Sequence, residues 1–192
     1  MRKIYKQMIV GSIFLTTAFV CFFILQSTRS SALQKEIHSW IGYQMNFPEG
    51  VRLISGDSAL LNKPYKILMY IDDMGCTGCN LKLQEWSDMY ETGFNTEIQD
   101  DLSVIILFEG SKKEDILMYV ESANWEMPVL WDRDGAISRR RQFSKQVRMR
   151  CMLLDKDNKV ALMGNPFYSH SVYDLYLKFF LNQTNYLQTT KN

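Results

Sequence analysis

The sequence predicts an α/β protein, a three-layer α/β/α sandwich preceded by an N-terminal transmembrane helix. Two observations carry this prediction. Short apolar runs alternate with amphipathic stretches along most of the chain, and one long uncharged apolar run stands near the amino terminus. With 192 residues, of which 46% are hydrophobic and 22% charged, the chain is long enough to bury a core and does not have the composition of a disordered or collagen-like protein.

The charge distribution bears on the choice of partner. Residues 1–32 contain four basic side chains and no acid, which leaves the remainder of the chain with a net charge of −3. A domain with that balance offers no broad positive surface to a polyanion. We therefore expect no nucleic acid among its partners.

The apolar run at residues 8–25 predicts contact with a membrane. As a helix its 18 residues would span about 27 Å, close to the thickness of a bilayer core. Basic residues precede it, so the positive-inside rule places the amino terminus in the cytoplasm and the rest of the chain outside. Residues 1–28 are either an anchor or a signal segment cleaved after Ala32. The anchor is favoured because the run exceeds the length of about 7–15 residues usual in a signal peptide.

Two further segments complete the predicted organisation. Residues 29–50 read as a short amphipathic lead-in helix followed by a turn and linker, and residues 51–190 as the folded domain. The expected location is the bacterial cell envelope, with the chain anchored in the inner membrane and the domain in the periplasm or outside the membrane. Secretion after cleavage of the signal is the alternative.

The first half of the domain reads as strand, helix, strand, helix. Residues 67–71 form a short apolar run bounded by turn residues, which suits a strand buried on both faces. Residues 76–90 carry apolar side chains at helical spacing. Residues 102–108 predict a second buried strand, and residues 113–124 a second amphipathic helix.

The second half predicts a short strand at 128–131, an arginine-rich helix at 135–143 and a strand at 149–154. A polar turn separates that strand from residues 159–163, so the two are expected to form a hairpin. A helix over 169–183, with apolar residues on one face, would then cover the sheet.

The motif Cys76-Thr77-Gly78-Cys79 is the chemically specific feature of the sequence. It stands where the first predicted strand passes into its helix, and a C-x-x-C in that context is a redox signature. Amide groups and the dipole at a helix start favour a thiolate at Cys76, which predicts that Cys76 is the nucleophile. Cys79, one turn later, would be the resolving thiol.

Three sequence stretches resemble a known family. They are YIDDMGCTGCNLKLQEW, the segment from Met127 to Asp132, and the run from Cys151 to Val160. They are similar to the membrane-tethered, thioredoxin-like proteins of the TlpA and thiol-disulfide oxidoreductase (redoxin) group, over roughly residues 35–183. The resemblance implies a thioredoxin-like fold and places Cys76 and Cys79 at the family's redox pair.

The sequence departs from this family at two places. The family has a cis-proline in a loop facing the cysteines, and the equivalent residue here is Met149. A trans bond is expected before it, because a non-proline cis bond costs about 2.5–4 kcal/mol. Met149 would add an amide donor to a substrate loop in which Arg148 and Arg150 select partners by charge. The second departure is that no acid lies within residues 66–71, where thioredoxins often keep a buried Asp as proton acceptor for the resolving cysteine. Asp72, Asp73 and Glu85 are interpreted as solvated acids, with the alternative that one of them, or water, takes over that role.

Other readings of the chemistry are weaker. A zinc site needs about four ligands, and the sequence has no second close pair of Cys or His, so no metal and no cofactor is expected. Cys151 is interpreted as a buried apolar strand residue, with redox modulation as the alternative. Residues 133–150 carry seven basic side chains and one acid. Such a run is usual on a solvated helix face, and it could also attract an acidic partner or anionic lipid.

These features predict an extracytoplasmic thiol-disulfide oxidoreductase. Its expected partners are protein thiols and disulfides, a thiol electron donor or acceptor, and the membrane through residues 8–25. The alternative is a redox-inactive thioredoxin-fold module that binds or organises a partner in the cell envelope.

Overall fold

The computed structural model describes residues 17, 19–22, 24, 27–28, 31–72, 82–110 and 112–189, the last seven by backbone alone. The chain forms two units, Met1–Trp40 and Ile41–Asn192. In the first unit, residues 31–40 are helical, as predicted for the lead-in segment. Most of the predicted membrane segment lies outside the described residues, and none of the helices within the described ranges is long and apolar enough to cross a membrane.

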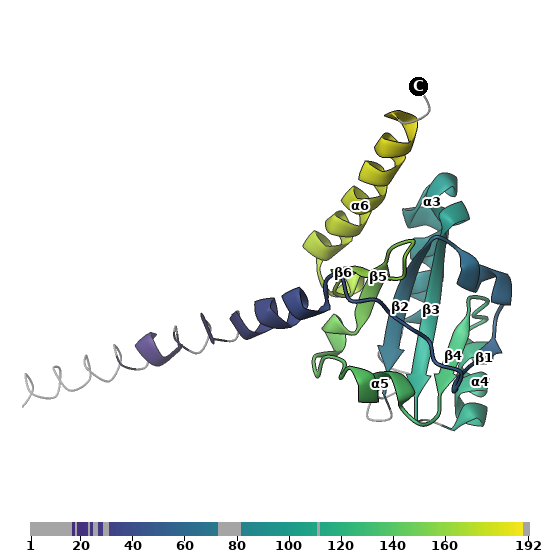
Figure 1. Ribbon diagram of the computed structural model, residues 1–192, viewed down its shortest axis with the longest axis horizontal. Coiled ribbons are helices and arrows are strands. Elements are labelled where there is room, and N and C mark those ends of the chain that lie inside the picture. Colours follow the sequence, from purple (N-terminus) through teal and green to yellow (C-terminus); the bar gives the residue numbers. More distant parts are fainter. Residues whose placement is uncertain are drawn as a thin grey trace, which may run out of the picture. The chain divides into compact units, whose positions relative to one another are not determined.

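A six-stranded mixed sheet is the centre of the second unit (Figure 1). Its spatial order is β1-β4-β3-β2-β5-β6. Strands β2, β3 and β4 run parallel to one another, whereas β1 pairs antiparallel with β4, β5 with β2, and β6 with β5. The strands are β1 (Val51–Ser55), β2 (Tyr65–Ile71), β3 (Leu102–Glu109), β4 (Val129–Asp132), β5 (Cys151–Leu154) and β6 (Val160–Met163).

The helices are short except for the last. They are α2 (Leu83–Asp88), α3 (Thr96–Asp101), α4 (Lys113–Ser122), α5 (Ala136–Arg140) and α6 (His170–Thr189). A π-helical turn at Met89–Gly93 continues α2, and 3₁₀ turns occur at Ser58–Asn62, Val147–Met149 and Pro166–Tyr168.

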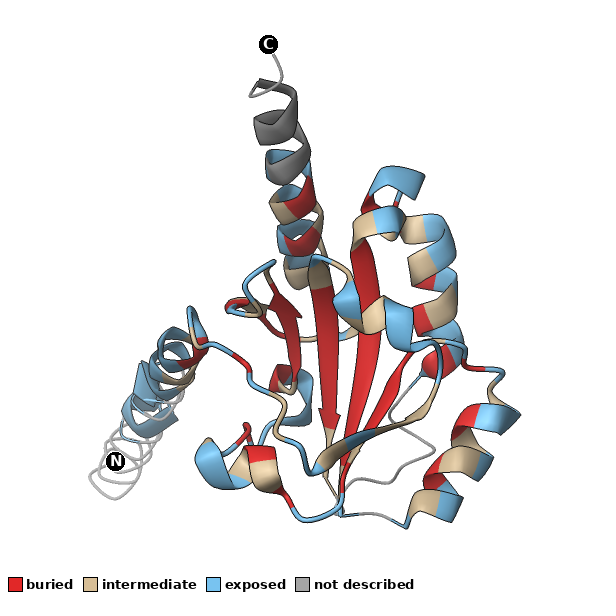
Figure 2. Cartoon of the chain, turned by 45° about the vertical axis from the view of Figure 1, so that its right-hand side comes forward, coloured by how far each residue is buried: buried red, intermediate tan, exposed pale blue. Residues whose placement is uncertain are grey.

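The two central strands are buried on both faces (Figure 2). Ile67 on β2 pairs with Val104 on β3, and both belong to a core cluster that includes Trp86 of α2. Because side chains alternate along a strand, Tyr70 points to the opposite face. There its ring stacks on Phe143, with 3.7 Å between the ring centroids. Helix α2 and the chain after α5 thus pack on different faces of the sheet.

Most predicted elements are present within two residues. The strands predicted at 67–71, 102–108, 128–131 and 159–163 and the helix at 113–124 are confirmed. The closing helix begins at His170 and is longer than predicted. The helix predicted at 135–143 ends at Arg140, and the strand predicted at 149–154 begins only at Cys151, because the residues before it form a 3₁₀ turn.

The predicted continuous helix over 76–90 is wrong. Lys82 has a left-handed backbone conformation, with φ of 48°, and helix α2 begins after it at Leu83. Cys76 and Cys79 lie in residues 73–81, outside the described residues. The helix start on which the pKa argument for Cys76 depends is therefore not part of α2.

Two elements were not predicted. Strand β1 contains the exposed Arg52 and is only five residues long, so its strand character depends on pairing with β4. Helix α3 begins directly after Asn95, whose side-chain oxygen accepts a hydrogen bond from the Ile98 amide at 2.9 Å. This is an ordinary N-cap, and the sequence Asn-Thr-Glu carries its signal.

Candidate functional site

Three parallel strands end at one edge of the sheet, which we call the carboxyl edge. Strand β2 ends at Ile71, β3 at Glu109 and β4 at Asp132. In open α/β sheets, ligands bind outside the carboxyl ends of the parallel strands. Cys76 follows Asp72 by four residues, and four residues of fully extended chain span at most about 14 Å. The chain itself therefore tethers the predicted cysteine pair to this edge.

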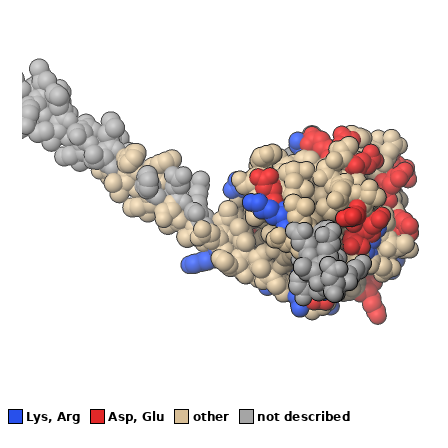
Figure 3. Space-filling view, turned by 90° about the horizontal axis from the view of Figure 1, so that it is seen from above, with Lys and Arg blue, Asp and Glu red and all other residues tan. Residues whose placement is uncertain are grey.

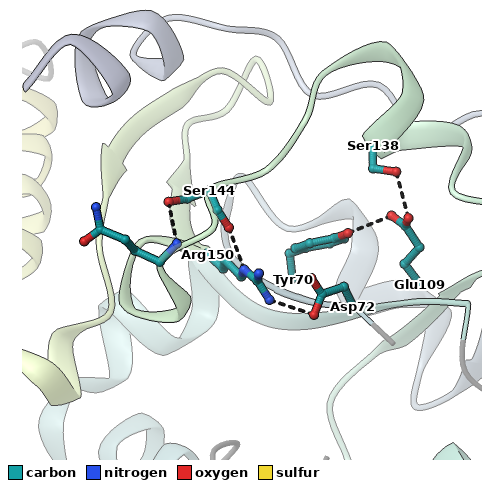
Figure 4. Close-up of polar contacts among 7 residues, drawn as sticks. Tyr70, Asp72, Glu109, Ser138, Ser144 and Arg150 are labelled. Carbon is teal, nitrogen blue, oxygen red and sulfur yellow. Dashed lines mark hydrogen bonds and ion pairs between the residues drawn. The ribbon is translucent and has the colours of Figure 1, made fainter. Parts of the chain in front are cut away.

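A cavity of about 930 Å³ opens at the carboxyl edge. Its polar side chains come from segments far apart in the sequence, and Figure 4 shows how they approach one another. The residues that line it and make polar contacts there are Tyr70, Asp72, Glu109, Ser138, Ser144 and Arg150.

Glu109 binds two hydroxyl groups. The Tyr70 hydroxyl donates to its Oε2 and the Ser138 hydroxyl to its Oε1, both at 2.8 Å. Burial, and then the hydrogen bond to Glu109, raise the pKa of the Tyr70 phenol well above its usual value. The phenol therefore remains a proton donor at any physiological pH.

Gly135 allows this close arrangement. Its φ is +67°, and a Cβ at this position would lie 2.7 Å from Glu109 Oε1. Asp132 fixes the adjacent start of α5, because its carboxylate accepts hydrogen bonds from the amides of Ala136 and Ile137 at 2.8 Å each. Helix α5 is thereby held beside the cavity.

Asp72 and Arg150 form an ion pair next to Tyr70. Arg150 Nη1 lies 2.7 Å from Asp72 Oδ1, and the two side chains are only 12% and 22% exposed respectively. Arg150 Nε also donates to the Ser144 carbonyl at 2.6 Å. The interpretation of Asp72 as a solvated acid is therefore wrong: it is a partly buried, paired carboxylate.

The three predicted substrate-loop residues have different environments. Arg150 is paired as just described, whereas Arg148 is exposed and donates to the Gln146 side chain at 3.0 Å. Met149 is 6% exposed, and no cis peptide bond occurs among the described residues, so the bond before it is trans as expected. The predicted extra amide donor is wrong, because the Met149 amide already donates to the Gln146 carbonyl at 2.8 Å. Contact of these residues with a substrate stays a prediction.

Cys151 lies in the core behind this edge. It is 2% exposed, and its Sγ lies 3.7 Å from the Tyr176 hydroxyl. Burial raises the pKa of the Cys151 thiol to about 12. A thiol in this environment is unreactive, which favours the interpretation of Cys151 as a buried strand residue.

Tyr70, Glu109 and Ser138 were not predicted as site residues. Their signal in the sequence is weak: Tyr70 is a polar-tipped aromatic near the end of an apolar strand, and Glu109 directly follows another apolar run. In the part of the chain that the structure describes, no three His, Cys, Asp or Glu side chains are grouped so that they could hold a metal ion.

No protein-family model and no curated protein matches this chain. Solved structures do match it. The thioredoxin domain of a thiol-disulfide oxidoreductase from Bacteroides vulgatus has a TM-score of 0.51 and 12% sequence identity, and the match covers 72% of this chain and 96% of that one. A thioredoxin-like protein from Porphyromonas gingivalis has a TM-score of 0.46 and 17% identity, over 61% and 73% of the two chains. The fold of this chain is thioredoxin-like.

Proposed function

We propose that this protein is a thiol-disulfide oxidoreductase that uses Cys76 and Cys79. The observation that carries the proposal is the position of the C-x-x-C motif. It begins four residues after Asp72, which directly follows the carboxyl end of strand β2 in a thioredoxin-like fold. Ligands bind at this edge in open α/β sheets, and two cysteines at this spacing can form a tight disulfide.

The proposed reaction is a two-step exchange. The Cys76 thiolate attacks one sulfur of a partner disulfide, so that a Cys76–partner bond forms and the second partner sulfur leaves as a thiolate. Cys79, after losing its proton, attacks Cys76 and releases the first partner sulfur. Two electrons pass to the partner, both partner sulfurs take up a proton, and Cys76 and Cys79 end as a disulfide.

The paired groups at the carboxyl edge support this chemistry by positioning. The ion pair with Arg150 fixes Asp72, the last described residue before the segment 73–81 that contains Cys76 and Cys79 (the cysteine segment). Next to it, Tyr70 and Ser138 hold the Glu109 carboxylate. Thiol-disulfide exchange requires the reacting sulfurs to be aligned, and a fixed position of Asp72 would limit where the cysteine segment can lie.

We further propose that the domain works outside the cytoplasm, with protein thiols and disulfides as substrates and a thiol donor or acceptor as second partner. The support is the uncharged run at residues 8–25 behind a basic flank. The protein should stay with the membrane fraction after a carbonate wash. Recovery of a soluble product that begins near Leu33 would instead identify a cleaved signal.

Trapping of the mixed disulfide tests the reaction. The full-length chain should be prepared in detergent in a Cys21→Ser background, because Cys21 is exposed. Cys79→Ser should accumulate a mixed disulfide through Cys76 with a protein disulfide substrate, and the matched Cys76→Ser variant should not. Absence of any adduct, together with ordinary alkylation kinetics of Cys76, would contradict the proposal and support the redox-inactive binding module.

A further inference from the structure

The segment that connects β4 to β5 at the carboxyl edge is strongly basic. Residues 133–150 connect the carboxyl end of β4 to the start of β5, and they carry seven basic side chains and one acid. Residues 82–101 have the reverse composition, with six acids and one lysine. These lead through α3 into the amino end of β3, and Figure 3, which views the molecule from above, shows Asp and Glu gathered on that side. Basic and acidic side chains are therefore concentrated in two different segments of the domain.

Two cations on the cavity wall are available to a ligand. Arg133 and Lys145 both line the cavity and are exposed, and neither has a hydrogen bond or ion pair within the described ranges. The other two basic residues of the wall are engaged: Arg150 binds Asp72, and the Arg139 guanidinium donates to the Asp134 carbonyl.

Three acids also line the cavity. Asp72 is paired with Arg150, and Glu109 is held by two hydroxyl groups. Asp134 is the remaining carboxylate of the wall, and it is the one acid in the segment with seven basic residues. A negatively charged ligand would therefore meet the unpaired Arg133 and Lys145 in a wall of four cations and three carboxylates, of which Asp134 alone has no side-chain partner among the described residues.

The shape of the site favours a polypeptide over a membrane surface. A cavity of about 930 Å³, with the stacked rings of Tyr70 and Phe143 in its wall, can enclose side chains. A lipid surface is flat and would contact protruding cations only. We infer that this cavity docks an acidic polypeptide segment beside the partner's cysteine, so that carboxylates of the partner meet Arg133 and Lys145. This inference rests on the proposed function for the identity of the partner.

Peptide binding tests the inference without sulfur chemistry. The full-length chain in phosphatidylcholine nanodiscs is titrated with two labelled peptides of equal length, in which aspartates or lysines flank a serine in place of cysteine. We expect the acidic peptide to bind about tenfold more tightly at low salt, with the advantage decreasing as salt is added. Arg133→Glu with Lys145→Glu should abolish the advantage.

Lys156→Glu with Lys178→Glu is the matched control. It makes the same change in net charge at two exposed residues outside the cavity wall, and it should keep the advantage. Equal binding of both peptides by the unmodified chain would overturn the inference. Loss of acidic-peptide binding in nanodiscs that contain phosphatidylglycerol would overturn it too, because it would assign the basic edge to lipid. Failure to exchange with a neutral cysteine peptide would overturn the proposed function alone.

Discussion

The two edges of the sheet use polar side chains in different ways. At the amino edge, Gln99 donates to the carbonyls of Tyr90, Glu91 and Phe94 at 2.8 to 3.0 Å, and the Tyr90 hydroxyl donates to the carbonyls of Gln99 and Leu102. At the carboxyl edge, side chains bind mainly to one another around a cavity.

This difference predicts which polar groups are structural and which belong to the proposed site. A side chain that satisfies backbone carbonyls closes a turn and stabilises the fold. Side chains that hydrogen-bond to one another beside an open cavity do not satisfy backbone groups. They hold charged groups in fixed positions, as a binding site requires. We therefore expect variants at the amino edge, where β3 begins, to reduce stability alone, and variants such as Arg150→Met at the carboxyl edge to change activity as well as stability.

The largest effect is expected for Gln99→Leu. The substitution removes the donors for three backbone carbonyls and should lower the free energy of unfolding by about 3 kcal/mol. The exchange rate of the molecules that remain folded should not change. Urea denaturation measures the first quantity. Gln84→Leu is the control, because Gln84 is exposed and, among the described residues, its side chain donates to the exposed Asp88. A loss of activity in Gln99→Leu without a loss of stability would contradict the comparison.

The sequence predicted the centre of the fold because burial dictates it. Strands β2 and β3 are apolar at almost every position, which only a doubly covered strand requires. Strand β1 was not predictable in the same way, since Arg52 interrupts its apolar pattern and its partner β4 lies more than 70 residues later.

The candidate site could be predicted only where it is local in sequence. The C-x-x-C spacing is visible in four residues, whereas Tyr70 and Glu109 are 39 residues apart. The parallel register of β2 and β3, with Ile71 opposite Phe108, brings them together at the end of the strands. The ion pair of Asp72 and Arg150 spans 78 residues, so no local pattern connects the two.

A smaller loss of stability is expected for Arg150→Met. Asp72 would keep its charge without its partner, which should cost about 1 to 2 kcal/mol, between the values for exposed and buried pairs. Exchange should slow several-fold, because the residue that leads into the cysteine segment is no longer fixed. The double variant with Asp72→Asn should recover part of the stability. Arg148→Met, at a neighbouring exposed arginine, should leave the stability unchanged. Equal effects of the two arginine variants would show that the ion pair has no special role.

The smallest effect at neutral pH is expected for Tyr70→Phe, which removes one of the two hydroxyl groups on Glu109 and should cost about 1 kcal/mol. The stability of this variant at alkaline pH is more informative. Folding raises the pKa of Tyr70, so the phenol ionises at lower pH in the unfolded chain than in the folded one. Its contribution to the free energy of unfolding is therefore complete below pH about 10 and is lost as the pH rises above that value. The loss for one such group is about 1.4 kcal/mol per pH unit.

Tyr70→Phe lacks this loss, so its disadvantage should shrink above pH about 10 and then reverse. Tyr168→Phe, at a tyrosine that is 47% exposed, is the control and should follow the unmodified chain in parallel. Urea midpoints measured from neutral to alkaline pH decide the outcome. If Tyr70→Phe and the unmodified chain lose stability in parallel, the Tyr70 phenol ionises as freely in the folded state as in the unfolded one. The bond to Glu109 would then not hold the carboxyl edge together, and the contrast between the two edges would fail at this residue.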